Sequence, residues 1–165
     1  MSSPNDLPEQ VDVLIVGAGL SGLCAARHLQ RSCPDRRFAI VEARERLGGT
    51  WDLFRYPGVR SDSDMYTLGF SFKPWAERKA IADGPSILRY LDETARETGI
   101  DQAIHYGLKA RAADWSSAEA QWTVTLEPAD GGAPRRIRCQ FLYLCSGYYS
   151  YAGGHAPTFP GVERF

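Results

Sequence analysis

The chain reads VDVLIVGAGLSG at residues 11–22, an apolar run followed by three glycines with the spacing GxGxxG. Apolar residues then recur at helical spacing until the chain meets Pro34. In such a strand–turn–helix unit the glycines allow a tight turn, and the helix N-terminus offers free N–H groups to an anion. The pattern predicts a Rossmann-type turn that holds the pyrophosphate of a dinucleotide.

A second apolar run, FAIVE at residues 38–42, ends on Glu42, which lies 20 residues beyond Gly22. An acid at this distance accepts hydrogen bonds from the ribose hydroxyls of an adenosine and repels a ribose 2′-phosphate. NADP is therefore a poor candidate for this first site, which leaves NAD or FAD. The glycine pair at residues 48–49, with Trp51 beside it, indicates a large flat ligand and favours FAD. Taken alone, Trp51 also fits a core tryptophan next to a glycine turn.

Strands are expected at residues 11–16 and 37–42, and helices from about Leu20 to Ser32 and from about Asp83 to Gly99. From Ile104 the apolar period changes to two, which predicts a small antiparallel meander. The apolar run FLYLC at residues 141–145 fits a buried parallel strand that returns to the main sheet. Residues 43–82 lack helical periodicity, and so long an irregular stretch is usually functional.

Bulk properties exclude several classes of protein. At 165 residues the chain suffices for one domain and is too short for two nucleotide-binding domains. The net charge is −1 and the basic residues are scattered, which argues against a nucleic-acid partner. Residues 1–10 are polar and are expected to form a disordered tail, without a signal peptide or transmembrane segment, in a cytoplasmic protein. Four cysteines and three histidines show no metal-ligand spacing, so no metal site is expected.

The stretch GGTWDLFRYPGVRSDSDMYTLGFSFKPW at residues 48–75 resembles the class B flavoprotein monooxygenases, above all Baeyer–Villiger monooxygenases of the ethionamide monooxygenase type. The similarity continues through residues 80–84, 113–115 and 141–149, and it covers essentially the whole chain as the N-terminal third of such an enzyme. It implies an α/β fold: a Rossmann-like FAD-binding domain over residues 11–150, with a parallel sheet and an antiparallel β-meander. This would be the N-terminal half of a flavoprotein with two dinucleotide-binding domains. Residues 151–165 would start the linker to a missing NADPH-binding domain.

The resemblance also implies roles for single residues. Gly17, Gly19, Ser21 and Gly22 would form the pyrophosphate turn, and Glu42 would accept from the adenosine ribose. The segment along the flavin would contain Gly49, Thr50, Trp51, Asp52 and Leu53. Ala110 stands where such proteins touch adenine through the backbone, although a valine is commoner there.

In such relatives an Arg-x-Asp tripeptide, here Arg60, Ser61 and Asp62, lies near the flavin and the nicotinamide, and the aspartate orients an arginine from later in the chain. We therefore assign Asp62 as the catalytic residue of this chain. Many relatives have cysteine in place of Ser61. Without the resemblance, Asp62 would be interpreted as a loop aspartate that caps a turn beside the Pro-Gly pair at residues 57–58.

The implied reaction uses NADPH and O2 with the cofactor FAD, and it inserts oxygen into a ketone or oxidises a thioether. One alternative is an N- or S-oxidising flavin-containing monooxygenase of the same fold. Another is an FAD- or NAD-binding module without catalysis of its own. The chain contains no second GxGxxG for NADPH, and the family fingerprint would begin at Phe165, the last residue. The chain alone is therefore expected to be an inactive fragment.

Overall fold

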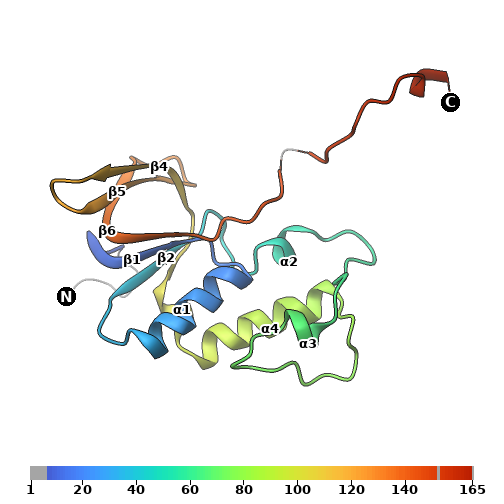
Figure 1. Cartoon of the computed structure of the whole chain (residues 1–165), viewed down its shortest axis with the longest axis horizontal. Helices are drawn as coiled ribbons and strands as arrows, with labels where there is room; N and C mark the ends of the chain where they lie inside the picture. Colours follow the sequence, from blue (N-terminus) through green and yellow to red (C-terminus); the bar gives the residue numbers. More distant parts are fainter. Residues whose placement is uncertain (1–6, 152, 165) are drawn as a thin grey trace.

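A six-stranded sheet in the order β3-β2-β1-β6-β5-β4 forms the centre of the protein (Figure 1). The computed structural model describes residues 7–151 and 153–164. The strands are β1 (Gln10–Val16), β2 (Phe38–Val41), β3 (Ile104–His105), β4 (Leu108–Ser116), β5 (Gln121–Pro128) and β6 (Arg135–Leu144). The helices are α1 (Leu20–Ser32), α2 (Thr50–Leu53), α3 (Met65–Leu68) and α4 (Gly84–Glu97), with 3-10 turns η1 (Ile100–Ala103) and η2 (Val162–Arg164).

The parallel half of the sheet is covered on both faces. Strand β1 pairs in parallel with β2 on one side and with β6 on the other. On one face Ile15 and Ile40 belong to an apolar core that α1 and α4 complete, and Figure 1 shows these two helices side by side beneath the sheet. On the other face Leu14 packs in a second core with Val124 and Leu126 of the meander. Burial on both faces explains why the strand sequences are continuously apolar.

Strand β6 has two sets of partners along its length. Its first half pairs antiparallel with β5, as in Leu126↔Arg135, and its second half pairs parallel with β1, as in Val16↔Leu144. The expected meander and the expected returning strand are therefore joined in one long strand. The predicted fold class, a Rossmann-like α/β domain with a parallel sheet and an antiparallel meander, is confirmed.

The two long helices have the expected positions. Helix α1 spans Leu20–Ser32 as predicted. Helix α4 begins after Asp83, whose carboxylate accepts the N–H of Ser86 at 2.9 Å. The helical stretch ends near Gly99, which has a φ of +69°. Among the described residues, none of the helices has both the length and the apolar character of a membrane span.

Two expectations about boundaries are wrong. Ile104 belongs to the short strand β3, which pairs in parallel with β2, and the meander begins only at Leu108. The cause is Gly107, whose φ of +66° turns the chain between the two strands. The ordered fold also starts before residue 10, where the predicted tail was expected to end. Leu7 is already buried, and Gln10 pairs with β6. Residues 1–6 lie outside the described residues.

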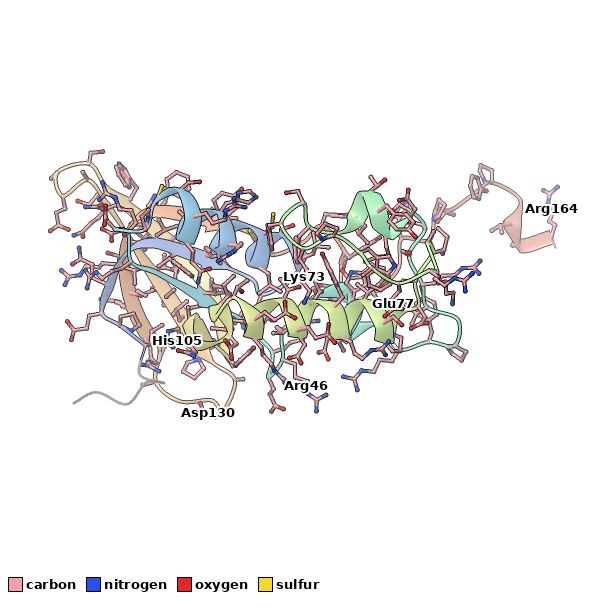
Figure 2. All side chains as sticks on the ribbon, turned by 90° about the horizontal axis from the view of Figure 1, so that it is seen from below. Arg46, Lys73, Glu77, His105, Asp130 and Arg164 are labelled. Carbon is pink, nitrogen blue, oxygen red and sulfur yellow. The ribbon has the colours of Figure 1, made fainter. Side chains whose placement is uncertain are left out.

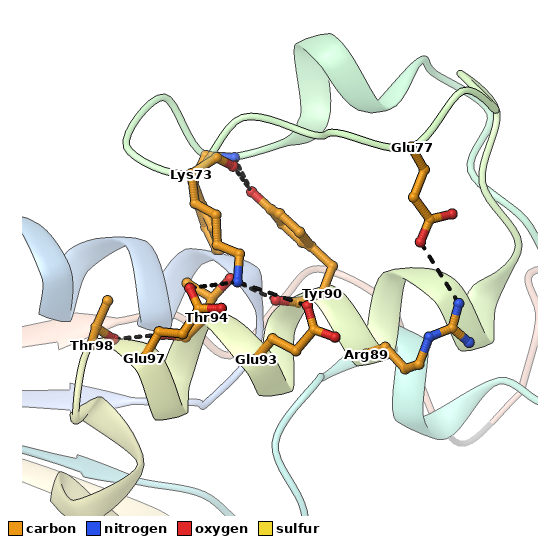
Figure 3. A network of polar contacts seen from close by, with 9 residues as sticks. Lys73, Glu77, Arg89, Tyr90, Glu93, Thr94, Glu97 and Thr98 are labelled. Carbon is orange, nitrogen blue, oxygen red and sulfur yellow. Dashed lines mark hydrogen bonds and ion pairs between the residues drawn. The ribbon is translucent and has the colours of Figure 1, made fainter.

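The irregular stretch between β2 and α4 is fastened to α4 by polar contacts (Figure 3). The hydroxyl of Tyr90 accepts the N–H of Phe70 at 2.7 Å and donates to the carbonyl of Lys73 at 2.5 Å. The Lys73 ammonium lies 2.8 Å from Glu97. In Figure 2, Lys73 and Glu77 both lie along α4, while Arg164 lies far from the sheet. This stretch between β2 and α4, which is mostly irregular, is therefore held in place by hydrogen bonds and an ion pair to α4.

Candidate functional site

The turn after β1 requires glycine at its first and last positions. Gly17 has a φ of +107°, and a Cβ on it would lie 2.4 Å from the carbonyl oxygen of Cys145. A Cβ on Gly22 would lie 1.9 Å from the carbonyl oxygen of Gly17. Real Cβ atoms do not approach backbone so closely, so a side chain at either position would force the turn apart.

Gly19, at the centre of the turn, is different, because the protein itself leaves room beside it. A Cβ on Gly19 would have Gly49 Cα as its nearest neighbour, at 3.6 Å, which is an ordinary contact. Gly19 is the N-cap of α1, which has no side-chain cap and no acidic residue in its first turn, where Ser21 lies. The first N–H groups of a helix lack intrahelical partners and attract anions. The uncapped helix N-terminus at Gly19 therefore fits the pyrophosphate of a dinucleotide.

Glu42 ties the end of β2 to this turn. It is 6% exposed, and its two carboxylate oxygens accept the N–H groups of Ala18 at 2.8 Å and Arg44 at 3.0 Å. The side chain of Arg44 lies 3.7 Å from the same carboxylate. A carboxylate has roughly four acceptor positions, so Glu42 retains capacity for two hydroxyl groups. Its position beside the turn fits the predicted role as ribose acceptor.

The second glycine turn lies directly against the first. The N–H of Gly48 donates to the carbonyl of Ala18 at 3.0 Å. A Cβ on Gly49, which has a φ of +56°, would lie 3.2 Å from Gly19 Cα. Helix α2 starts from Gly49 with Thr50 as its first residue. The structure thus brings the predicted pyrophosphate turn and the start of the predicted flavin segment into contact.

The side chains of α2 have separate environments. Trp51 is partly buried against the core that α1 and α4 complete. Asp52 is buried, and its carboxylate is paired with the guanidinium of Arg55 at 3.0 Å. Leu53 is half-buried. The side chain of Asp52 is therefore held by Arg55, and this pair stabilises the end of α2.

The Arg-x-Asp tripeptide is held by the residues that precede α4. The backbone of Arg60 forms an isolated antiparallel β-bridge with that of Asp83. Ser61 is buried, donates its N–H to the carbonyl of Ala82 at 2.9 Å, and accepts the Ala82 N–H on its hydroxyl at 3.1 Å. Asp62 is exposed. The side chain of Ser61 thus has a structural role, whereas Asp62 points outward where a partner can reach it.

Ala110 lies on β4 at the adenosine side of the candidate site. Two residues before it, Leu108 donates its N–H to the carbonyl of Glu42 at 2.9 Å. The pairing of β4 with β5 shifts between Ala110 and Ala112, which is a β-bulge. The residue that this bulge leaves unpaired is Arg111, whereas Ala110 itself pairs with Leu126. The backbone contact of Ala110 with adenine therefore stays a prediction.

Sequence reasoning missed four aromatic or charged side chains near this site. The guanidinium carbon of Arg44 lies 5.7 Å from the ring centre of Tyr151. The ring of Phe54 contacts those of Tyr149 and Tyr151. The hydrogen bond and charge of Tyr148 raise the pKa of Tyr149, and the carboxylate of Asp62 raises it further. No local spacing signals the contacts of Arg44 and Phe54 with the tyrosines, because they join residues about 100 positions apart.

Known proteins share both the sequence and the fold. A family model described as an NAD(P)-binding Rossmann-like domain matches residues 15–83. The FAD-containing monooxygenase EthA of Mycobacterium tuberculosis is 56% identical over 96% of the chain, and that of Mycolicibacterium smegmatis is 55% identical. A solved steroid monooxygenase bound to NADP superposes with a TM-score of 0.78 at 28% identity over 94% of the chain. OTEMO in complex with FAD and NADP gives a TM-score of 0.75, also at 28% identity over 94% of the chain.

The chain spans about a third of these relatives, with 32% of EthA, 29% of the steroid monooxygenase and 29% of OTEMO covered. The family resemblance seen in the sequence is confirmed by this identity, which extends over nearly all of the chain. The chain is therefore similar over nearly all of its length to FAD-containing monooxygenases, and it matches about a third of theirs.

Proposed function

We propose that residues 11–150 bind FAD and that the chain is the flavin-binding part of an NADPH- and O2-dependent monooxygenase. The observation that carries the proposal is the glycine turn itself: the uncapped N-terminus of α1 at Gly19 lies beside Gly49, and Glu42 accepts the N–H of Ala18. Relatives named FAD-containing monooxygenases and a solved neighbour with FAD and NADP support it.

The residues of the chain bind and orient the cofactor. The N–H groups at the start of α1 would hold the pyrophosphate, and Glu42 would accept from the adenosine ribose. The backbone of Ala110 would contact the adenine, and the start of α2 would contact the flavin. When bound, FAD supplies the hydride acceptance and O2 chemistry that protein side chains lack.

The proposed substrate is a ketone, into which oxygen is inserted, or a thioether, which is oxidised. The alternatives are an N- or S-oxidising flavin-containing monooxygenase and a binding module without catalysis. We assign Asp62 to turnover and not to cofactor retention, because its side chain is exposed while its neighbour Ser61 is anchored. In a full-length version of the protein, Asp62→Ala should keep its FAD and slow reduction by NADPH. Wild-type reduction rates in that variant would make Asp62 a simple loop residue.

FAD binding by the chain itself tests the proposal. The purified chain is titrated with FAD and, separately, with NAD, and binding is followed by the quenching of flavin fluorescence and by calorimetry. Gly19→Val should abolish FAD binding, because the side chain would fill the pyrophosphate space. Gly153→Val is the matched control, because Gly153 has open space around it. Binding of NAD without FAD would overturn the proposal, as would undiminished FAD binding in a folded Gly19→Val variant.

The state of the thiols fits a cytosolic location, which is part of the proposal. All four cysteines are free thiols. Burial raises the pKa of Cys145 to about 11, so its thiol stays protonated and unreactive. Free buried thiols are typical of proteins in a reducing compartment.

A further inference from the structure

Residues 147–151, here called the tyrosine segment, read GYYSY and begin three residues after Leu144, the last residue of β6. Between the two, Cys145 donates its N–H to the carbonyl of Val16 at 2.8 Å, which places the start of the segment beside the glycine turn. Gly147 has a φ of +78°, and a Cβ on it would lie 3.3 Å from the hydroxyl of Tyr151. The segment therefore folds back on itself at the mouth of the candidate site.

On the adenosine side, the tyrosine segment reaches Arg44. The ring of Tyr151 lies 5.7 Å from the guanidinium carbon of Arg44, at cation–π distance. Arg44 in turn contacts Glu42 through its backbone N–H, at 3.0 Å, and through its side chain, at 3.7 Å. Tyr151 is thus connected to the predicted ribose acceptor by a single intervening side chain.

On the flavin side, the same segment reaches Phe54, the residue after α2. The ring centres of Phe54 and Tyr149 lie 6.0 Å apart, edge to face, and those of Phe54 and Tyr151 lie 6.5 Å apart. The pKa of Tyr149 is raised mainly by its hydrogen bond with Tyr148, and the charge of Asp62 adds to this effect. The segment therefore contacts both flanks of the glycine turn, where the two halves of a dinucleotide would lie.

We propose that the tyrosine segment is part of the dinucleotide site, with Tyr151, held between Arg44 and Phe54, closing over the bound cofactor and slowing its release. This inference rests on the proposed function. Tyr149 and Tyr151 are 49% and 51% exposed, so each retains free ring surface on which a flat ligand can stack. Aromatic rings stack on nucleotide bases and on guanidinium groups, and they give up little conformational entropy.

The rate of FAD release from the chain tests the inference. The FAD complex is diluted, and the recovery of free-flavin fluorescence gives the dissociation rate. Tyr151→Ala should release FAD about threefold faster or more, in line with the loss of one cation–π and stacking contact. Tyr151→Phe, which keeps the ring, should release FAD at the wild-type rate. Phe159→Ala is the matched control, since Phe159 is a 63% exposed aromatic of the C-terminal stretch that leads away from the sheet in Figure 1.

A double-variant cycle tests whether Arg44 acts through Tyr151. Arg44→Met should also speed FAD release, and adding Arg44→Met to Tyr151→Ala should speed it by less than the product of the two single effects. Thermal unfolding of each variant without FAD separates loss of fold from loss of the contact.

The outcomes distinguish the two proposals. FAD release from Tyr151→Ala at the rate of Phe159→Ala would overturn the role of the tyrosine segment while leaving FAD binding intact. Independent effects of Arg44→Met and Tyr151→Ala would overturn the coupling between the two side chains. A wild-type chain that binds no FAD would overturn the proposed function, and the role of the segment with it.

Discussion

Gly17 and Gly19 stand two positions apart in one turn and have opposite relations to the protein around them. Gly17 has a positive φ, and a Cβ on it would collide with the carbonyl of Cys145, whereas Gly19 has ordinary dihedrals and a Cβ on it would make only an ordinary contact with Gly49. We expect Gly17→Ala to lower the free energy of unfolding by about 1–3 kcal/mol or more, with or without FAD. Urea unfolding measures this loss.

The same substitution at Gly19 should affect ligand binding more than stability. Gly19→Ala should destabilise the cofactor-free chain by much less than Gly17→Ala, because the nearest atom to the new Cβ lies 3.6 Å away and only the weaker N-cap preference of alanine opposes it. It should weaken FAD binding, because the methyl group enters the space of the pyrophosphate. Equal losses of stability in the two variants would contradict the distinction between a glycine for the turn and a glycine for the ligand.

The charge of Asp62 provides a prediction about pH. This carboxylate contributes to the raised pKa of Tyr149, because a nearby negative charge disfavours the phenolate. Asp62→Asn should therefore lower the pKa of Tyr149, so that this tyrosine ionises at lower pH. Ultraviolet difference titration against the wild-type chain measures the change, with Asp35→Asn as an exposed control. An unchanged titration curve would separate Asp62 from the tyrosine segment.

Residues joined by local sequence were predictable, and residues joined across the fold were not. Gly17 and Glu42 belong to one strand–helix–strand unit. The length of that unit predicts from the sequence that the two residues lie close together in space. The contacts of Tyr151 with Arg44 and Phe54 depend on where β6 enters the sheet, which no nearby residue reveals. The pairing of Asp52 with Arg55 was also missed, although a spacing of three residues on a helix is a local signal for it.

At the scale of elements, the irregular stretch before α4 depends on one hydroxyl. This hydroxyl, on Tyr90, accepts the N–H of Phe70 and donates to the carbonyl of Lys73 (Figure 3). Burial raises the pKa of Tyr90, which keeps the hydroxyl protonated. We expect Tyr90→Phe to cost about 1–3 kcal/mol of stability, because a buried N–H loses its partner.

Tyr66→Phe is the control for this change. Tyr66 is 61% exposed, and its hydroxyl donates to the carbonyl of Glu77 at 3.3 Å. Its loss should stay within about 0.5 kcal/mol. Thermal unfolding compares the two variants, and equal effects would show that the Tyr90 hydroxyl does not anchor the loop.

Elements with a strong period were predicted well, and those defined by pairing were not. Helix α1 shows a 3.6-residue period up to a proline, and α4 has an aspartate cap and a proline in its first turn. Strand β3 has only two residues, too few for any period, and it exists because it pairs with β2. The continuity of β6 was hidden because its first half faces a meander and its second half lies in a parallel sheet.

At the scale of the whole molecule, we expect the 165-residue chain to show no oxygenase turnover, even with FAD added. It spans about a third of its relatives, and the resemblance places the NADPH site and the arginine partner of Asp62 beyond Phe165. NADPH consumption and ester or sulfoxide formation from a simple ketone or thioether provide the assay. Product above a control without the chain would contradict the assignment.

The shared strand β6 sets where this protein can change in length over evolution. One register of β6 aligns the meander, and the other places Cys145 against Gly17. A one-residue insertion within β6 would move side chains to the opposite face in one of its two halves. The turn at residues 129–134 is exposed and lies outside both registers. Insertions and deletions among descendants of this sequence should therefore collect in that turn, while β6 itself keeps a constant length.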